Sequence, residues 1–200
     1  MEIPVKQLSA ISLLVATAAA MRVGMNWAAL AIAIPFYGVV VKIGLSETLA
    51  FTSGYVFGPI QGFITGALII IISDLFTWAG LWTPFIAIII GMLGLLGGIF
   101  CRFRSNLSII ALGIVAIVLT LISELLQNIW FGWYMWSFYM PETPFQIVLA
   151  ATLVDGLPSM VTAVISNTIL FVIVMPRIIK LLREWFLLNP QSKFLKCREG

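Results

Sequence analysis

The sequence predicts an all-α integral membrane protein, a bundle of six transmembrane helices with both termini in the cytoplasm. Of its 200 residues, 62% are hydrophobic and 10% are charged, whereas soluble proteins are roughly half apolar and a quarter charged. The mean hydropathy is +1.12. The apolar residues form continuous runs of about 20, the length that a helix needs to cross about 30 Å of hydrocarbon. A membrane barrel would instead alternate in segments of about ten residues.

Glycine, proline and charged residues divide the apolar sequence into six expected spans, at residues 7–25, 38–57, 59–78, 83–101, 107–132 and 147–175. The apolar stretch 26–37 contains Pro35 and is short for a crossing of its own. It is either a membrane-dipping loop or the start of a longer second helix. We expect one transmembrane domain, residues 1–185, followed by a short cytoplasmic C-terminal tail, residues 186–200.

The positions of the basic residues predict the orientation. With both termini inside, only Arg22 and Lys42 lie towards the outside, which is a strong positive-inside bias. The cytoplasmic set is then Lys6, Arg102, Arg104, Arg177, Lys180, Arg183, Lys193, Lys196 and Arg198. The connection 133–145 contains no basic residue and is rich in Trp and Tyr, so we expect an external loop at the membrane interface.

The first 22 residues also allow a second interpretation, a cleavable signal peptide. Lys6, the apolar stretch after it and the small residues Ala16, Ala18 and Ala20 fit that pattern. Against it, the segment before the apolar stretch has a single basic residue, and the stretch continues to Arg22.

Small residues recur every fourth position in the first expected span, at Ser12, Ala16, Ala20 and Gly24. This spacing places small side chains along one helix face and allows another helix to approach closely. We call these four residues the small-residue seam. The seam serves either packing within this bundle or docking to another membrane protein. Similar spacings at Gly58, Gly62 and Gly66, and at Gly94 and Gly98, are expected to be internal.

The residues between the second and third spans, GYVFGPIQG at 54–62, predict a tight inside turn. Proline favours a helix start, and glycine permits close backbone approach. Together with Gly66 and Asp74 they form a longer pattern, F-G-P-x-x-G-x-x-x-G followed by an acidic residue near the outer end of the same helix.

This pattern resembles the substrate-binding S-components of energy-coupling factor (ECF) vitamin transporters, and the resemblance covers most of the chain. Such subunits have six helices, an Ala-x-x-x-Ala face on the first helix that meets the coupling subunit, a Gly-Pro turn after the second, and a basic cytoplasmic C-terminus. The corresponding residues are Ala16, Ala20, Gly58, Pro59, Arg177, Lys180 and Arg183. The Gly-Pro turn and Arg22 look most like the folate and pantothenate branches.

The resemblance implies a binding subunit in the plasma membrane of a prokaryote. It would capture a small organic vitamin or precursor from outside, in a pocket covered by the loops after helices one and five. A transmembrane coupling subunit and two cytoplasmic ATPase subunits would drive uptake. The partner-interface residues would be the small-residue seam. No cofactor is expected.

Polar side chains inside the spans are the candidate substrate-binding residues, because ionisable groups in lipid usually face a cavity or a partner. Glu124 and Asn128 are four apart and share one helix face. Asp155 lies early in the last span, and Asp74, Arg22 and Lys42 complete the charged set: Arg22, Lys42, Asp74, Glu124, Asn128 and Asp155. Each carboxylate could instead pair with a basic residue of the bundle.

Aromatic residues near Glu124 add Trp133 and Tyr139 to the candidate ligand contacts, since aromatic faces stack on flat heterocycles. Their neighbours are Trp130, Tyr134 and Trp136. An interfacial aromatic belt is the alternative explanation. Asn167 is expected to lie too deep for a ligand and to form an interhelical hydrogen bond.

Several function classes are excluded or disfavoured. No G-x-x-x-x-G-K-[ST] loop occurs, so the usual ATP cradle is missing and the energy for uptake must come from partners. Histidine is absent, which argues against a metal site. No nucleic-acid partner is expected. The alternatives are a membrane-embedded enzyme using Asp74, Glu124 or Asp155 for proton transfer or metal binding, and a structural membrane subunit without a ligand.

Overall fold

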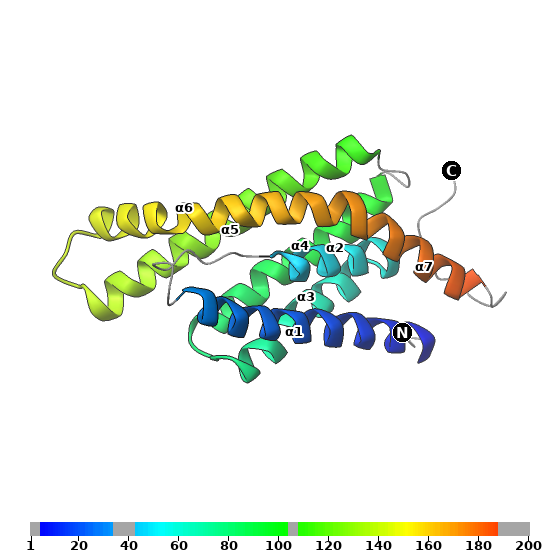
Figure 1. The fold of residues 1–200 in the computed structure, drawn as a ribbon, viewed down its shortest axis with the longest axis horizontal. Coiled ribbons are helices and arrows are strands. Elements are labelled where there is room, and N and C mark those ends of the chain that lie inside the picture. The colour runs from blue at the N-terminus through cyan, green and yellow to red at the C-terminus, as the bar shows by residue number, and fades with distance from the viewer. Residues whose placement is uncertain (1–4, 34–42, 104–107, 188–200) are drawn as a thin grey trace.

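The computed structural model describes residues 5–33, 43–103 and 108–187, and every regular element in these ranges is helical. The helices are α1 (Val5–Ala33), α2 (Leu45–Phe57), α3 (Pro59–Phe76), α4 (Trp82–Phe103), α5 (Ile109–Tyr139), α6 (Phe145–Ile169) and α7 (Met175–Leu187). A π-helical segment, Leu170–Val174, joins α6 to α7 without a break (Figure 1). The all-helical prediction is confirmed for the described residues.

Helix α1 buries one face against α2 and α3. Its buried apolar residues recur three and four positions apart, as a helix with one packed face requires; they are Ala10, Ile11, Leu14, Val15, Ala18 and Ala19. Residues 26–33 continue this helix. Both expectations for that stretch are therefore wrong: it is neither a separate dipping loop nor the start of the second helix. The reason is its alanine-rich sequence, which favours helix and contains no breaker before Pro35.

Helix α2 is short and enclosed. Its 13 residues rise about 20 Å, less than the roughly 30 Å of hydrocarbon. All of them except Phe57 are buried, chiefly against α3, α4 and α1. The expected span 38–57 was thus too long, since Ile43 and Gly44 precede the helix. Among the residues that the structure describes, five helices are long and apolar enough to cross a membrane, and α2 completes the bundle as an inner helix.

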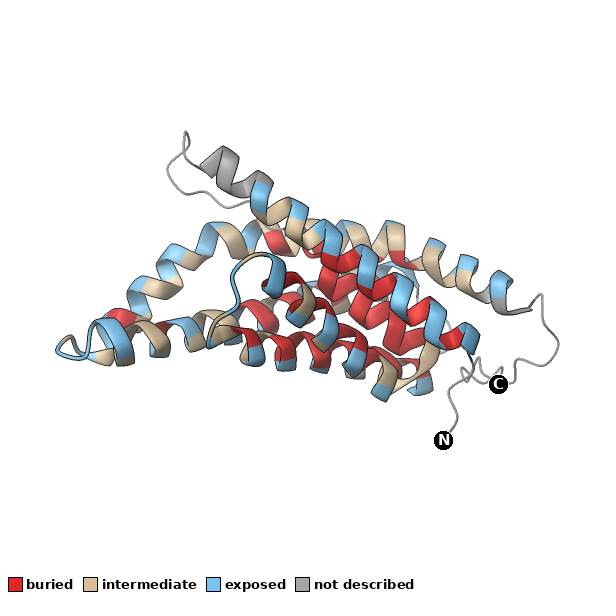
Figure 2. Ribbon diagram, turned by 90° about the horizontal axis from the view of Figure 1, so that it is seen from below, coloured by how far each residue is buried: buried red, intermediate tan, exposed pale blue. Residues whose placement is uncertain are grey.

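Glycines allow the backbones of α2, α3 and α4 to touch. Gly58 has φ 113°, which favours glycine, and it forms the predicted turn between Phe57 and Pro59. A Cβ on Gly62 or on Gly94 would collide with the carbonyl oxygen of the other residue. One on Gly66 would meet the carbonyl of Ile90. The expected internal glycine packing is confirmed, and Figure 2 shows the buried residues concentrated in this part of the bundle.

Helices α5 and α6 form a hairpin whose connecting end extends beyond the other helices (Figure 1). Close packing joins them, because a Cβ on Gly156 would collide with the side chain of Asn128 and one on Gly132 would meet Thr152 and Leu149. Helix α5 runs to Tyr139, past the expected end at 132, so the predicted external loop 133–145 is largely helix. Only residues 140–144 connect the two helices.

The start of α1 and the end of α7 lie at the same end of the bundle, on the right in Figures 1 and 2. The continuous helix formed by α6, the π-helical segment and α7 extends past residue 175, the expected end of the sixth span, to Leu187. Ends on one side agree with an even number of crossings. The placement of both ends in the cytoplasm stays a prediction from the positive-inside bias. The boundary at residue 185 between the transmembrane domain and the C-terminal tail also stays a prediction.

Replacement of Gly94 by alanine is expected to destabilise the bundle. The added methyl group would meet backbone that cannot rotate away, and such overpacking typically destabilises by about 1–3 kcal/mol. Gly24 is the matched control, because a Cβ there has no atom within 4 Å. Thermal unfolding of the purified protein in detergent should show a lower midpoint for Gly94→Ala than for Gly24→Ala. Equal midpoints would contradict the close backbone contact.

Candidate ligand-binding site and partner face

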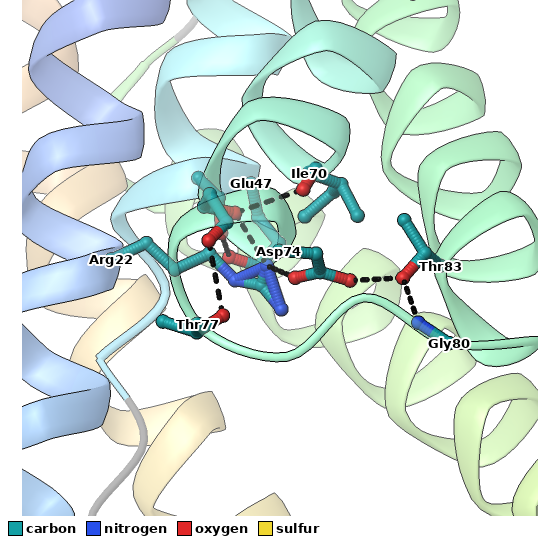
Figure 3. A network of polar contacts seen from close by, with 9 residues as sticks. Arg22, Glu47, Ile70, Asp74, Thr77, Gly80 and Thr83 are labelled. Carbon is teal, nitrogen blue, oxygen red and sulfur yellow. Dashed lines mark hydrogen bonds and ion pairs between the residues drawn. The ribbon is translucent and has the colours of Figure 1, made fainter.

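Arg22 of α1 and Asp74 of α3 form a largely buried ion pair (Figure 3). Nη1 of Arg22 lies 3.1 Å from Oδ1 of Asp74. The side chains are 24% and 3% exposed, respectively. Charge in a low-dielectric interior requires such a partner, because removal from water is unfavourable for each ion alone. The structure therefore brings together two of the predicted substrate-binding residues, and it pairs them with one another.

Hydroxyl groups complete the surroundings of this pair. The same Nη1 of Arg22 donates to Oγ of Ser73 at 3.0 Å. Thr83, at the start of α4, donates to Oδ2 of Asp74 at 2.7 Å and accepts from the backbone N–H of Gly80 at 3.1 Å. The network thus joins α1 to the α3–α4 turn. Thr83 was missed in the sequence because a single hydroxyl carries no spacing signal.

Glu47 of α2 is a buried acidic residue that the sequence analysis did not select. It is 3% exposed, its Oε2 accepts from Oγ of Ser46 at 2.8 Å, and it lies beside the Arg22–Asp74 pair in Figure 3. An acidic residue inside the expected span 38–57 was the available signal. The first helices thus gather three charged side chains at one level of the bundle.

A polar face runs along the inner side of α5. Thr120, Ser123, Gln127 and Trp130 follow one another three and four residues apart, so they share one side of the helix. Gln127 donates to Oγ of Ser123 at 3.0 Å. Thr120 accepts from Asn167 of α6, and Trp130 stacks on Phe85 of α4, which orients this face towards the rest of the bundle.

A matching stripe of polar residues occupies α6. Its members are also three and four residues apart: Thr152, Asp155, Ser159, Thr162 and Ser166. The apolar residues on another side of this helix, Val154, Leu157 and Val161, are exposed, as a lipid-facing surface would be. At the end of the stripe, Oγ of Ser166 accepts from the backbone N–H of Gly44 at 3.3 Å. We call the α5 face and the α6 stripe together the polar hairpin face. Asp155 is its exposed carboxylate.

Glu124 and Asn128 lie where α5 meets α6. Glu124 is 2% exposed. Asn128 donates through Nδ2 to the backbone carbonyl of Glu124 at 2.9 Å, and its side chain packs on Gly156. The two residues do share a helix face, as the four-residue spacing predicted. Whether they contact a ligand stays a prediction.

Aromatic side chains cover the end of the hairpin nearest α4. Trp130 stacks between Phe85 and Trp133, with ring centroids 4.4 and 4.8 Å apart. Tyr134 contacts Trp82 edge-on at 6.1 Å and Tyr139 at 5.7 Å. The predicted contacts Trp133 and Tyr139 belong to this cluster. They come from helix α5, and the loop that was expected to carry them does not exist at those positions.

Asn167 forms the interhelical hydrogen bond that was expected. It is fully buried, and its Nδ2 donates to Oγ1 of Thr120 at 3.0 Å. Gly44, at the start of α2, packs directly on its side chain, where a Cβ would collide. Asn167 therefore holds α2, α5 and α6 together.

The small-residue seam faces away from the bundle. Ser12, Ala16, Ala20 and Gly24 are all exposed, while the opposite side of α1 is buried. Packing within this chain therefore does not explain the seam in the described structure. Docking to another membrane protein is the remaining interpretation.

The predicted site residues divide into two groups. Arg22 and Asp74 join α1 to α3, whereas Glu124, Asn128, Trp133, Tyr139 and Asp155 belong to the hairpin. Lys42 lies outside the described residues. Within the described ranges, no cluster of three or more His, Cys, Asp or Glu side chains could hold a metal ion.

These features define a class of protein, a multi-pass membrane subunit with a polar, aromatic-lined hairpin and an exposed small-residue helix face. A family model described as "ECF-type riboflavin transporter, S component" matches residues 2–180. The chain belongs to this family and is a substrate-binding subunit of a vitamin transporter, a class of proteins that are not enzymes. No curated protein and no solved structure was found to match. This match points to the riboflavin branch, whereas the Gly-Pro turn and Arg22 had pointed to the folate and pantothenate branches.

Breaking the Arg22–Asp74 pair is expected to destabilise the protein. Asp74→Asn leaves the arginine without its counter-charge, which for a largely buried pair destabilises by about 3 kcal/mol. The double variant R22M/D74N should recover much of the loss, since it removes both charges. Thermal unfolding in detergent measures both effects.

The matched control is Glu184→Gln, which breaks the exposed Lys180–Glu184 pair at 3.9 Å. Exposed pairs contribute roughly 0–1 kcal/mol, so little change is expected. If Asp74→Asn unfolds at the same temperature as this control, the ion pair does not hold α1 in place.

Proposed function

We propose that this protein captures riboflavin at the outer surface of a prokaryotic plasma membrane and delivers it with a transmembrane coupling subunit and two cytoplasmic ATPases. The family match over residues 2–180 carries the proposal. The polar hairpin face and the aromatic cluster support it, because they suit the chemistry of this ligand.

Riboflavin combines a flat heterocycle with a chain of hydroxyl groups and carries no charge at neutral pH. Aromatic side chains such as Trp133 and Tyr139 suit the flat ring. Hydroxyl, amide and carboxylate groups suit the hydroxyl chain and the ring carbonyls. An uncharged ligand needs no free cation, which agrees with the engagement of Arg22 by Asp74.

We assign the ligand contacts to the hairpin, at Glu124, Asn128, Trp133, Tyr139 and Asp155. The Arg22–Asp74 pair serves as the fixed frame that holds α1 against the α3–α4 turn. Asp155 is an exposed carboxylate within a membrane helix, which supports this choice, because such a group in a membrane span normally serves a function.

The small-residue seam is the proposed docking face for the coupling subunit. Small residues let a second helix approach closely, and in lipid such packing is a main source of helix association. The open space beside Gly24 supports this assignment. The ATP-binding machinery would come from the partner subunits.

The first test is riboflavin binding by the full chain, purified in detergent and freed of co-purified ligand. Stacking on aromatic residues quenches flavin fluorescence, so titration should show saturable quenching with one riboflavin per chain. Mass spectrometry of the untreated preparation should find the same compound. Folate and pantothenate should not compete. Absence of binding, or chemical conversion of the bound compound, would contradict the proposal.

The second test separates docking from binding. Ala20→Trp places a large side chain in the seam, and the lost packing should reduce riboflavin uptake roughly tenfold or more. Riboflavin affinity of the purified chain should stay unchanged. Uptake is measured in cells that express the coupling and ATPase subunits.

The control for this test is Met21→Trp, an exposed position on another side of the same helix. It places the same indole ring outside the seam and should leave uptake near the level of the unchanged protein. Equal uptake by the Ala20 and Met21 variants would overturn the docking assignment.

A further inference from the structure

Trp130 presents a buried hydrogen-bond donor without an acceptor. Its indole Nε1 is inaccessible to solvent and has no hydrogen-bond partner in the described part of the chain. Buried polar groups are nearly always paired, and an unpaired one destabilises a protein by about 1–3 kcal/mol. Such a donor is stable in place only if the surrounding structure holds it there or a ligand satisfies it.

The surrounding structure holds this ring firmly. Phe85 of α4 stacks on Trp130 at 4.4 Å with an interplanar angle of 14°, and Trp133 stacks on it at 4.8 Å and 30°. Two close stacking partners restrict rotation of the indole ring. The N–H is therefore pre-positioned in one direction, as a donor for a ligand should be.

The position of Trp130 connects it to the polar hairpin face. It follows Gln127 by three residues and Ser123 by seven, on the same side of α5. Beyond Trp133, the aromatic residues towards the hairpin end are exposed: Phe138 is 57% and Tyr139 64% exposed. Exposed side chains can move aside for a ligand without breaking buried packing.

We infer that Nε1 of Trp130 donates a hydrogen bond to an acceptor of the bound ligand. This inference rests on the proposed function, in which the ligand is riboflavin. Its ring carbonyls and hydroxyl groups are acceptors of the required kind. Trp130 is then a specificity-determining residue, because a ligand lacking an acceptor at that point leaves the donor buried and unpaired.

The test is Trp130→Phe, which keeps an aromatic ring against Phe85, removes the donor and makes the side chain smaller. Riboflavin affinity should fall roughly 5- to 30-fold, the value of one buried hydrogen bond. Without ligand, removal of the unpaired donor and loss of ring packing act in opposite directions on stability, so the unfolding temperature should stay close to that of the unchanged protein. Fluorescence titration and thermal unfolding measure the two effects.

Trp78→Phe is the matched control, because Trp78 is 66% exposed and lies outside the hairpin. It should change neither affinity nor stability. Unchanged riboflavin affinity in Trp130→Phe overturns the inference and leaves the proposed function standing. Failure of the unchanged protein to bind riboflavin overturns the proposed function and this inference with it.

A second variant tests the inference if Trp130→Phe fails to fold. Site-specific incorporation of benzothienylalanine at position 130 replaces the N–H by sulfur and preserves the size and shape of the indole. The same fall in riboflavin affinity is expected. Affinity equal to that of the unchanged protein would show that the donor takes no part in binding.

Discussion

Polar groups inside a membrane protein must be satisfied by the protein itself, since hydrocarbon offers no hydrogen bonds. This constraint explains where the helices meet. The Arg22–Asp74 pair with Ser73 and Thr83 joins α1, α3 and α4. Asn167, bonded to Thr120 and packed on Gly44, joins α6 to α5 and α2. One polar network thus holds α1 to α3 and α4, and the other holds the hairpin to the start of α2.

Apolar surface adds little specificity to these contacts, because lipid is as apolar as leucine and the hydrophobic effect does not drive helices together in it. Close backbone contact takes that role. Gly62 and Gly94 bring α3 and α4 together until no Cβ fits between them. These close backbone contacts join α2, α3 and α4. The hairpin, held mainly by its own α5–α6 packing, carries the polar and aromatic groups that suit a ligand.

The helices and their glycine contacts could be predicted because both depend on local composition and spacing. The apolar runs predicted the number of continuous helices, and the four-residue glycine spacing predicted the internal helix contacts. The errors have a common cause. The stretch 26–33 is rich in alanine, and no proline interrupts 133–139. Hydropathy alone could not show that α1 and α5 continue past the expected membrane boundary.

The site was harder to predict because charge in a sequence does not show which partner satisfies it. Arg22 and Asp74 are 52 residues apart, and either could have faced a ligand until their contact was seen. The hydroxyl stripe on α6 had a readable three-and-four spacing, but serine and threonine in a membrane helix usually bond to their own backbone, as Thr152 and Ser159 do here. The neighbouring helix distinguishes a candidate ligand-binding surface from hydroxyl groups that only bond to their own backbone. Thr152 of the α6 stripe lies against Gly132 of α5, and Asn167 of α6 bonds to Thr120 of the α5 face, so helix packing brings the two polar surfaces together.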